Sequence, residues 1–128
     1  MNYFFNKKVT LSFDDAIQKV TEELKKDGFG VLTEIDVKET LKKKLDVDFK
    51  KYKILGACNP GFAYKALQNE DKIGVMLPCN VIVEENEDGS VEVSAVDPVA
   101  SMQAVGNENL GKIAGEVRDK LRAVVERL

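Results

Sequence analysis

No histidine occurs among the 128 residues of the chain. This absence excludes Ser-His-Asp and Cys-His nucleophilic catalysis, zinc sites of the HExxH type and histidine ligation of haem. Any general acid or base would have to be an Asp, Glu, Lys, Tyr or Cys side chain. The chain is therefore chemically sparse, which favours a non-enzymatic protein, and we expect neither a metal ion nor another cofactor.

Long apolar runs are also absent. No stretch approaches the ~20 apolar residues that cross a membrane. The first ten residues, MNYFFNKKVT, have too short an apolar stretch for a signal peptide, and no small-residue cleavage site follows. We therefore expect a cytoplasmic protein without a membrane partner, whose two cysteines are free thiols.

An excess of basic residues is lacking as well. The formal net charge is −3, whereas nucleic-acid binding usually needs a basic face. The densest basic stretch, residues 38–53, is typical of a solvated helix face with an adjoining loop. We expect no nucleic-acid partner.

The residues that are present have the pattern of one soluble α+β domain spanning residues 1–128. The hydrophobic share is 44% and the charged share 32%, as in globular proteins. Strand patterns cover residues 3–9, 29–35, 51–58, 80–85 and 90–96, and helical patterns cover 12–28, 36–45, a segment from 59, a short turn from 97 and the chain after 106. We predict a mostly antiparallel sheet of about five strands with helices on one face.

Local signals mark where several of these elements begin and end. Ser12, with Asp15 three residues later, predicts the start of the first long helix, and Gly28 predicts its end. Asp36 is the expected cap of the second helix. Gly30, within the second strand pattern, is expected where another backbone approaches closely.

The two cysteines have similar neighbours, because each is followed by asparagine and lies near a proline. The Asp88-Gly89 step predicts a tight hairpin that returns residue 97 beside residue 79. If strand 51–57 runs antiparallel to strand 80–85, residue 58 reaches the same end of the sheet. The candidate site consists of Cys58, Asn59, Pro60, Pro78, Cys79, Asn80 and Asp97.

Each candidate residue also has a purely structural interpretation. Cys58 precedes a helix N-terminus, which would stabilise a thiolate, but a free cysteine is often buried as a small apolar group. We expect burial, which keeps the Cys58 thiol neutral, to outweigh the helix end, which would favour the thiolate. Asn59 and Asp97 are typical helix caps, with Pro60 at the first helical position, and Asn80 could satisfy backbone groups at the start of its strand. Two cysteines and one aspartate are an incomplete set of metal ligands.

Four segments together resemble the domain of unknown function 302 family. They are GFGVLTEIDVKETLKKKL (28–45), YKILGACNPGFAYKAL (52–67), GVMLPCNVIV (74–83) and VSAVDP (93–98). The resemblance runs from about residue 10 into the last helix. It implies a fold like that of the TATA-binding protein, in the order β-α-β(4)-α with inserted short helices. It also implies a homodimer and a bacterial or archaeal source, but no established activity.

Three classes of function remain open. The first is a non-enzymatic dimeric domain that binds a small ligand at the end of the sheet near Cys58 and Cys79. The second is a thiol-dependent redox or metal-responsive protein that uses the same two cysteines. The third is a structural or interaction module without a ligand. We favour the first, because polar residues converge on this end in a chain with few reactive groups.

Overall fold

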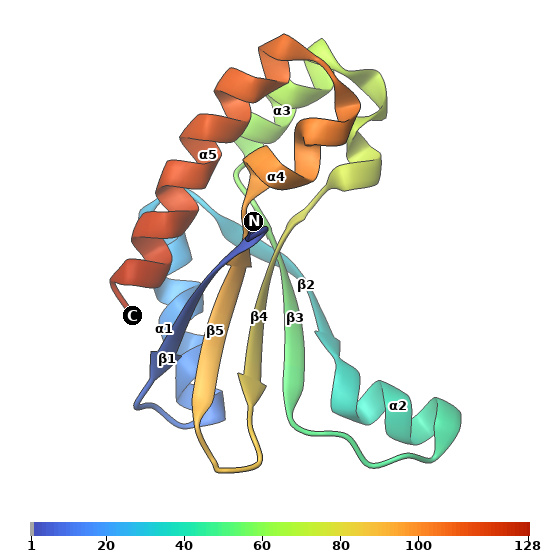
Figure 1. Cartoon of the computed structure of the whole chain (residues 1–128), viewed down its shortest axis with the longest axis vertical. Helices are drawn as coiled ribbons and strands as arrows, with labels where there is room; N and C mark the ends of the chain where they lie inside the picture. Colours follow the sequence, from blue (N-terminus) through green and yellow to red (C-terminus); the bar gives the residue numbers. More distant parts are fainter. Residues whose placement is uncertain (1) are drawn as a thin grey trace.

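A computed structural model describes residues 2–128 (Figure 1). The chain runs through β1 (Phe4–Val9), α1 (Phe13–Lys26), β2 (Gly30–Asp36), α2 (Val37–Leu45), β3 (Tyr52–Cys58), α3 (Pro60–Asn69), the 3₁₀ segment η1 (Asp71–Met76), β4 (Cys79–Glu85), β5 (Val91–Val96), α4 (Pro98–Met102), the 3₁₀ turn η2 (Gln103–Val105) and α5 (Glu108–Glu126). This is the β-α-β(4)-α order with short helices inserted.

The five strands form one sheet in the order β1-β5-β4-β3-β2, and every neighbouring pair is antiparallel. The long helices α1 and α5 contact the sheet, and in Figure 1 α1 lies behind the strands while α5 runs beside β1. The segments α3, η1, α4 and η2 gather beyond one end of the sheet, and α2 projects from the other end. The predicted α+β class is confirmed. No helix within residues 2–128 is long and apolar enough to cross a membrane.

The predicted helix boundaries are confirmed by their capping contacts. The Ser12 hydroxyl accepts a hydrogen bond from the Asp15 amide at 3.2 Å. A carboxylate oxygen of Asp36 accepts one from the Glu39 amide at 3.0 Å. Gly28 follows α1 with φ at +84°, a left-handed conformation that glycine adopts at little cost.

Buried apolar side chains form two separate clusters. The larger lies between the sheet and the helices α1 and α5, and contains Leu24, Leu55, Val81, Val93 and Leu121 among others. The smaller lies beyond the end of the sheet and consists of Ala66, Ile73 and Leu110, with Leu77, Met102 and Val105 against it. We call the helical segments around this smaller cluster, α3 to η1 and α4 to η2, the helical cap.

A group of ion pairs joins the end of α1 to the end of the chain. Buried Glu23 lies 2.7 Å from Lys26 Nζ and 2.7 Å from Arg127 Nε. Arg127 also contacts Asp27 at 2.9 Å. The hydrogen bonds from Lys26 and Arg127 lower the pKa of Glu23 from 4.5 to about 2. The carboxylate is therefore ionised at neutral pH and holds α1 against α5.

Candidate functional site

Strand pairing brings the two cysteines together. Cys79, at the start of β4, has Ala57 of β3 as its register partner, so Cys58 is the next residue along β3. Both cysteines are free thiols, Cys79 buried and Cys58 half-buried. Both line one cavity, together with Asn59 and Pro78. The structure thus groups four of the seven candidate residues around a common space.

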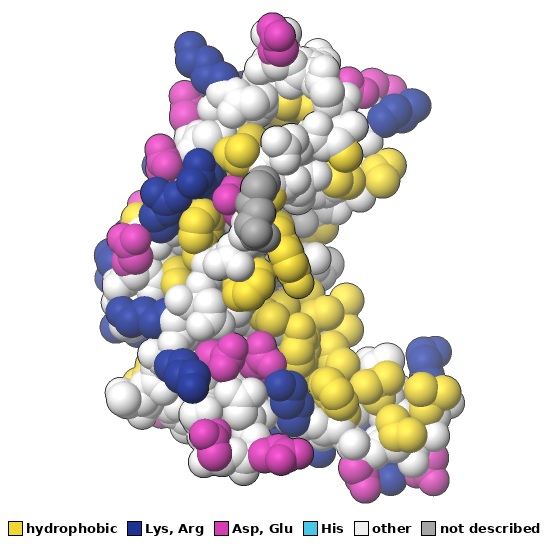
Figure 2. Space-filling view, in the orientation of Figure 1, with side chains coloured by type: hydrophobic (Ala, Val, Ile, Leu, Met, Phe, Trp, Pro, Cys, Tyr) yellow, Lys and Arg dark blue, Asp and Glu magenta, His cyan; other side chains and the backbone are white. Residues whose placement is uncertain are grey.

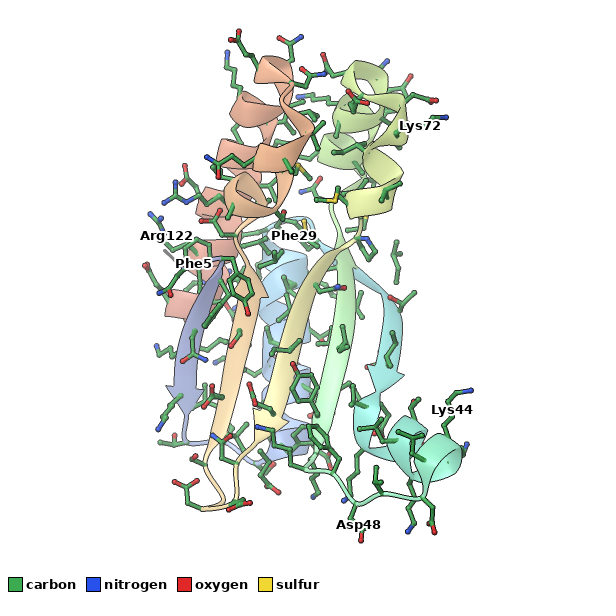
Figure 3. All side chains as sticks on the ribbon, turned by 45° about the vertical axis from the view of Figure 1, so that its right-hand side comes forward. Phe5, Phe29, Lys44, Asp48, Lys72 and Arg122 are labelled. Carbon is green, nitrogen blue, oxygen red and sulfur yellow. The ribbon has the colours of Figure 1, made fainter. Side chains whose placement is uncertain are left out.

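This cavity lies where the end of the sheet meets the helical cap, and its volume is about 30 Å³. Phe29 lies there, beneath the cap in Figure 3. The remaining lining residues are Ala57, Phe62, Ala63, Ala66, Leu77, Pro98, Met102, Ile113, Ala114 and Val117. Ala57, Phe62 and Val117 belong to the larger apolar cluster, and Ala66, Leu77 and Met102 belong to the smaller one. The cavity is therefore a gap at the seam between the two clusters, walled almost entirely by apolar groups.

Asn59 is occupied by structural hydrogen bonds. Its side-chain oxygen accepts from the Phe62 amide at 3.5 Å, which caps α3 as expected. Its amide nitrogen donates to the Asp27 carbonyl at 3.3 Å. Pro60 is the exposed first residue of α3 and does not line the cavity. Asn59 thus fixes the start of α3 to the end of α1.

Asn80 and Asp97 do not join the cavity. Asn80 is exposed and alternates with buried Cys79 and Val81, so its side chain lies on the opposite face of the sheet. Asp97 accepts a hydrogen bond from the Val99 amide at 3.0 Å and lies 3.5 Å from Arg118 Nε. It therefore caps α4, as expected. Neither side chain belongs to the cavity, although the pairing of Val81 with Ala95 brings residue 97 back to the end of the sheet where Cys79 begins β4, as the hairpin predicts.

Burial controls the chemistry of Cys79. Its removal from water, with a smaller effect from the charge of Cys58, raises the pKa of Cys79 from 9.0 to about 11. Burial disfavours the charged thiolate, so this thiol is neutral at physiological pH. Cys79 is thus a poor nucleophile in the folded protein.

Gly56 is a positioning residue of this site that the sequence did not reveal. A β-carbon at residue 56 would overlap the Thr33 hydroxyl and lie 2.8 Å from Cγ of Pro78. The absence of a side chain thus lets Pro78 pack over β3. The close approach expected at Gly30 was wrong, because a β-carbon there meets no atom within 4 Å. In the sequence, the signal for such a close approach is a glycine within a strand, and Gly30 and Gly56 both carry it.

A second hollow lies on the face of the sheet opposite α1 and α5. This open-face groove has a volume of about 420 Å³ and is lined by Tyr3, Phe4, Tyr52, Asn80, Ile82, Glu84, Glu92, Ser94, Ala95 and Val96. Figure 2 shows apolar side chains gathered in the concave side of the molecule. Glu92 accepts hydrogen bonds from Asn6 and Asn86, and the bond from Asn86 is the main cause of its lowered pKa. This groove was not predictable from the sequence, because its residues come from four strands whose order along the sheet is not readable from their spacing.

Within residues 2–128, no three acidic, cysteine or histidine side chains gather closely enough to hold a metal ion.

The chain belongs to the family described as Domain of unknown function DUF302, whose sequence model matches residues 5–128. Among solved structures, it is similar to the uncharacterized conserved protein DUF302 from Bacillus stearothermophilus. The two share 28% sequence identity with a TM-score of 0.92, over 99% of this chain and 98% of the other. The search of curated proteins gave no match.

Proposed function

We propose that this protein is a non-enzymatic binding domain, and that it holds a small apolar ligand in the cavity beside Cys58 and Cys79. The observation that carries the proposal is the position of the cavity at the seam between two apolar clusters. The buried residues of the two clusters are separate, so widening the seam keeps both buried cores and loses chiefly the contact that Phe62 of α3 makes with the larger cluster. The end of the sheet and α5 supply one wall, and the helical cap supplies the other.

The size of the cavity makes this widening necessary. A volume of about 30 Å³ holds one or two water molecules, since each needs roughly 10–15 Å³. Sites for organic ligands are roughly 300–1,000 Å³. A bound ligand must therefore move the helical cap away from the ends of β3 and β4.

The lining residues define the chemistry of the ligand. Among the residues that the structure describes, none that lines the cavity is charged. Both polar groups of Asn59 have hydrogen-bond partners. Cys58, Cys79 and Met102 contribute sulfur atoms, which are polarizable and make favourable contacts with aromatic rings. An aliphatic or aromatic ligand without a charge is thus the best match.

Titration with the neutral fluorescent probe N-phenyl-1-naphthylamine tests the proposal. Ala63 lines the cavity and is half-buried, so Ala63→Leu fills the space. We expect a loss of about tenfold or more in affinity, because overfilling a packed site costs ~1–3 kcal/mol. Ala123→Leu, also at a half-buried alanine but away from the cavity, is the control and should bind as wild type. Equal binding by both variants would refute the proposal, and the absence of binding by wild type would favour a module without a ligand.

A thiol function is the second candidate, and the adjacency of Cys58 and Cys79 supports it. In this scheme peroxide oxidises the Cys58 thiolate to a sulfenic acid with release of hydroxide, and Cys79 then displaces water to form a disulfide. The raised pKa of Cys79 opposes the second step. Peroxide treatment followed by mass spectrometry checks it: loss of two hydrogens in wild type but not in Cys58→Ser would support the disulfide.

Two broader expectations accompany these proposals. We propose a cytoplasmic location, as we expected from the sequence. A bacterial or archaeal source is supported by the Bacillus origin of the solved relative.

A further inference from the structure

Three sulfur-containing side chains meet at the cavity where the sheet joins the helical cap. Cys58 ends β3, Cys79 begins β4 and Met102 ends α4, and all three line this cavity. In Figure 3 sulfur atoms, drawn in yellow, lie where the ends of the strands meet the cap. Met76 of η1 is not among the lining residues. Three segments that are distant in the sequence thus each bring one sulfur atom to a common space.

The two thiols are close neighbours in this space. Cys79 lies opposite Ala57 in the pairing of β3 with β4, so Cys58 is one residue further along β3. The charge of Cys58 contributes to the raised pKa of Cys79, an effect that requires the two groups to be near each other. Met102 approaches from the helical cap, and its unbranched side chain adapts readily to its surroundings. The three sulfur atoms can therefore draw together around one centre.

Sulfur ligands of this kind select a soft metal ion. Thiolates and thioethers suit Cu(I), whereas carboxylates, carbonyls and water suit magnesium, calcium and manganese. A structural zinc ion takes four ligands, mostly from cysteine and histidine, but the lining residues that the structure describes supply only two cysteines and no histidine or carboxylate. Cu(I) needs fewer ligands than zinc and accepts a thioether, so two cysteines and a methionine form a suitable set.

The size and access of the cavity also suit a single ion. Its volume of about 30 Å³ exceeds the roughly 10–15 Å³ that one water molecule needs, and a Cu(I) ion is smaller than a water molecule. Cys58 and Met102 are half-buried, whereas Cys79 is buried. Two of the sulfur-bearing residues are thus partly accessible to solvent and the third lies deeper. An ion does not require the widening that an organic ligand requires.

We propose that Cys58, Cys79 and Met102 bind one Cu(I) ion in this cavity. On binding, each thiol loses its proton to solvent and its sulfur bonds to copper, while the thioether of Met102 donates a lone pair. No electron is transferred. Two thiolates around one monovalent cation leave a net negative charge, and the positive end of the α3 dipole, next to Cys58, partly offsets it.

This metal site departs from what we expected of the sequence. There, two cysteines and Asp97 were an incomplete set of ligands. Met102 supplies the third ligand instead, and it reaches the cysteines only because α4 folds over the end of the sheet. The site gives the two thiols a role that depends neither on the apolar ligand nor on oxidation by peroxide.

Anaerobic titration with Cu(I), in competition with the chelator bicinchoninate, tests the proposal. Wild type should withdraw one Cu(I) per chain from the chelator. Met102→Leu removes the thioether at nearly constant volume. It should weaken binding by roughly tenfold or more, because even the outer-shell partners of a metal are typically worth that much. Met76→Leu is the matched control, since Met76 lies outside the cavity, and it should bind as wild type.

X-ray absorption at the copper edge gives an independent readout of the ligands. We expect three sulfur neighbours in wild type and two in Met102→Leu, and Cys58→Ser should lose competitive binding. A wild type that withdraws no Cu(I), or a Met102→Leu variant that binds as tightly as wild type, would overturn the proposal. Binding of N-phenyl-1-naphthylamine without Cu(I) would refute the metal site alone, and binding of Cu(I) without the probe would refute the apolar ligand alone.

Discussion

Cys58 and Cys79 lie side by side but differ in their access to solvent. Cys58 is half-buried, whereas Cys79 is buried and its pKa is raised to about 11. The sequence led us to expect burial at Cys58 as well, but the structure leaves this residue half-buried. At pH 7 we therefore expect iodoacetamide to modify Cys58 first and to leave Cys79 unmodified until the protein unfolds. Mass spectrometry of the alkylated protein over time checks this. Cys58→Ser should remove the early phase, and early labelling of Cys79 would contradict the burial that the structure gives it.

Gly56 and Gly30 provide a matched pair of single-residue tests. Gly56→Ala forces a β-carbon against Thr33 and Pro78, so we expect a loss of about 1–3 kcal/mol in the free energy of unfolding. Gly30→Ala meets no atom within 4 Å and should be neutral, or more stable by roughly 0.5 kcal/mol. Urea denaturation of both variants measures the difference. Equal free energies of unfolding for Gly56→Ala and Gly30→Ala would show that the packing of Pro78 does not require a glycine at residue 56.

Residue roles were predictable where they depend on local sequence. Ser12, Asp36, Asn59 and Asp97 cap helices as expected, because a cap bonds an amide only two or three residues away. The surroundings of Gly56 were not predictable. They depend on Thr33 and Pro78, which belong to other segments and reach it only through strand pairing.

The contact between α1 and the end of the chain should make stability depend on pH. The folded pKa of Glu23, about 2, lies below its ordinary value of 4.5. Its ionised form therefore stabilises the fold fully above about pH 4.5, and this contribution is lost as the pH falls toward 2. Thermal unfolding of wild type and of Glu23→Gln measures the effect.

The comparison needs a second variant that removes one carboxylate elsewhere on α1. Glu22→Gln serves, since Glu22 is exposed. We expect the fall in melting temperature between pH 5 and pH 3 to be smaller in Glu23→Gln than in Glu22→Gln. Identical pH profiles for the two variants would show that Glu23 does not couple α1 to Arg127.

Element types were largely predictable, but their arrangement was not. The five strands and the long helices follow from apolar periodicity, which is a local property of the chain. The sheet order was not readable: β1 pairs with β5, more than 80 residues away. The segment η1 was also missed, because a 3₁₀ helix of six residues has no clear periodic signal.

The separation of the two apolar clusters has a consequence for the dynamics of the whole molecule. The cluster within the helical cap has three buried residues, and Phe62 joins α3 to the large cluster that the strands share. We therefore expect amide hydrogens of α3 and α4 to exchange faster than those of β4 and β5, since small clusters open at lower free energy. Hydrogen exchange with mass spectrometry checks this. Equal protection of the amide hydrogens in the helical cap and in the sheet would contradict the proposal that the seam between the clusters can widen.

The location of the candidate site could be inferred from the sequence, but its character could not. Hairpin and antiparallel reasoning brought the cysteines to one end of the sheet. Asn80 also lies at this end, but the alternation of side chains along β4 turns it toward the other face. The apolar cavity depends on how α3, α4 and α5 pack over that end, and the spacing of residues along the chain does not specify such packing.

The most direct test of ligand binding beside the cysteines is a methyl NMR titration with N-phenyl-1-naphthylamine. The methyl group of Met102 reports on the cavity, and those of Ile82 report on the open-face groove. Binding at the seam of the two clusters predicts that the Met102 signal shifts with saturation while the Ile82 signals do not move. If the Ile82 signals shift and the Met102 signal does not, or if neither shifts, the proposal that the ligand binds in the cavity beside the cysteines is contradicted.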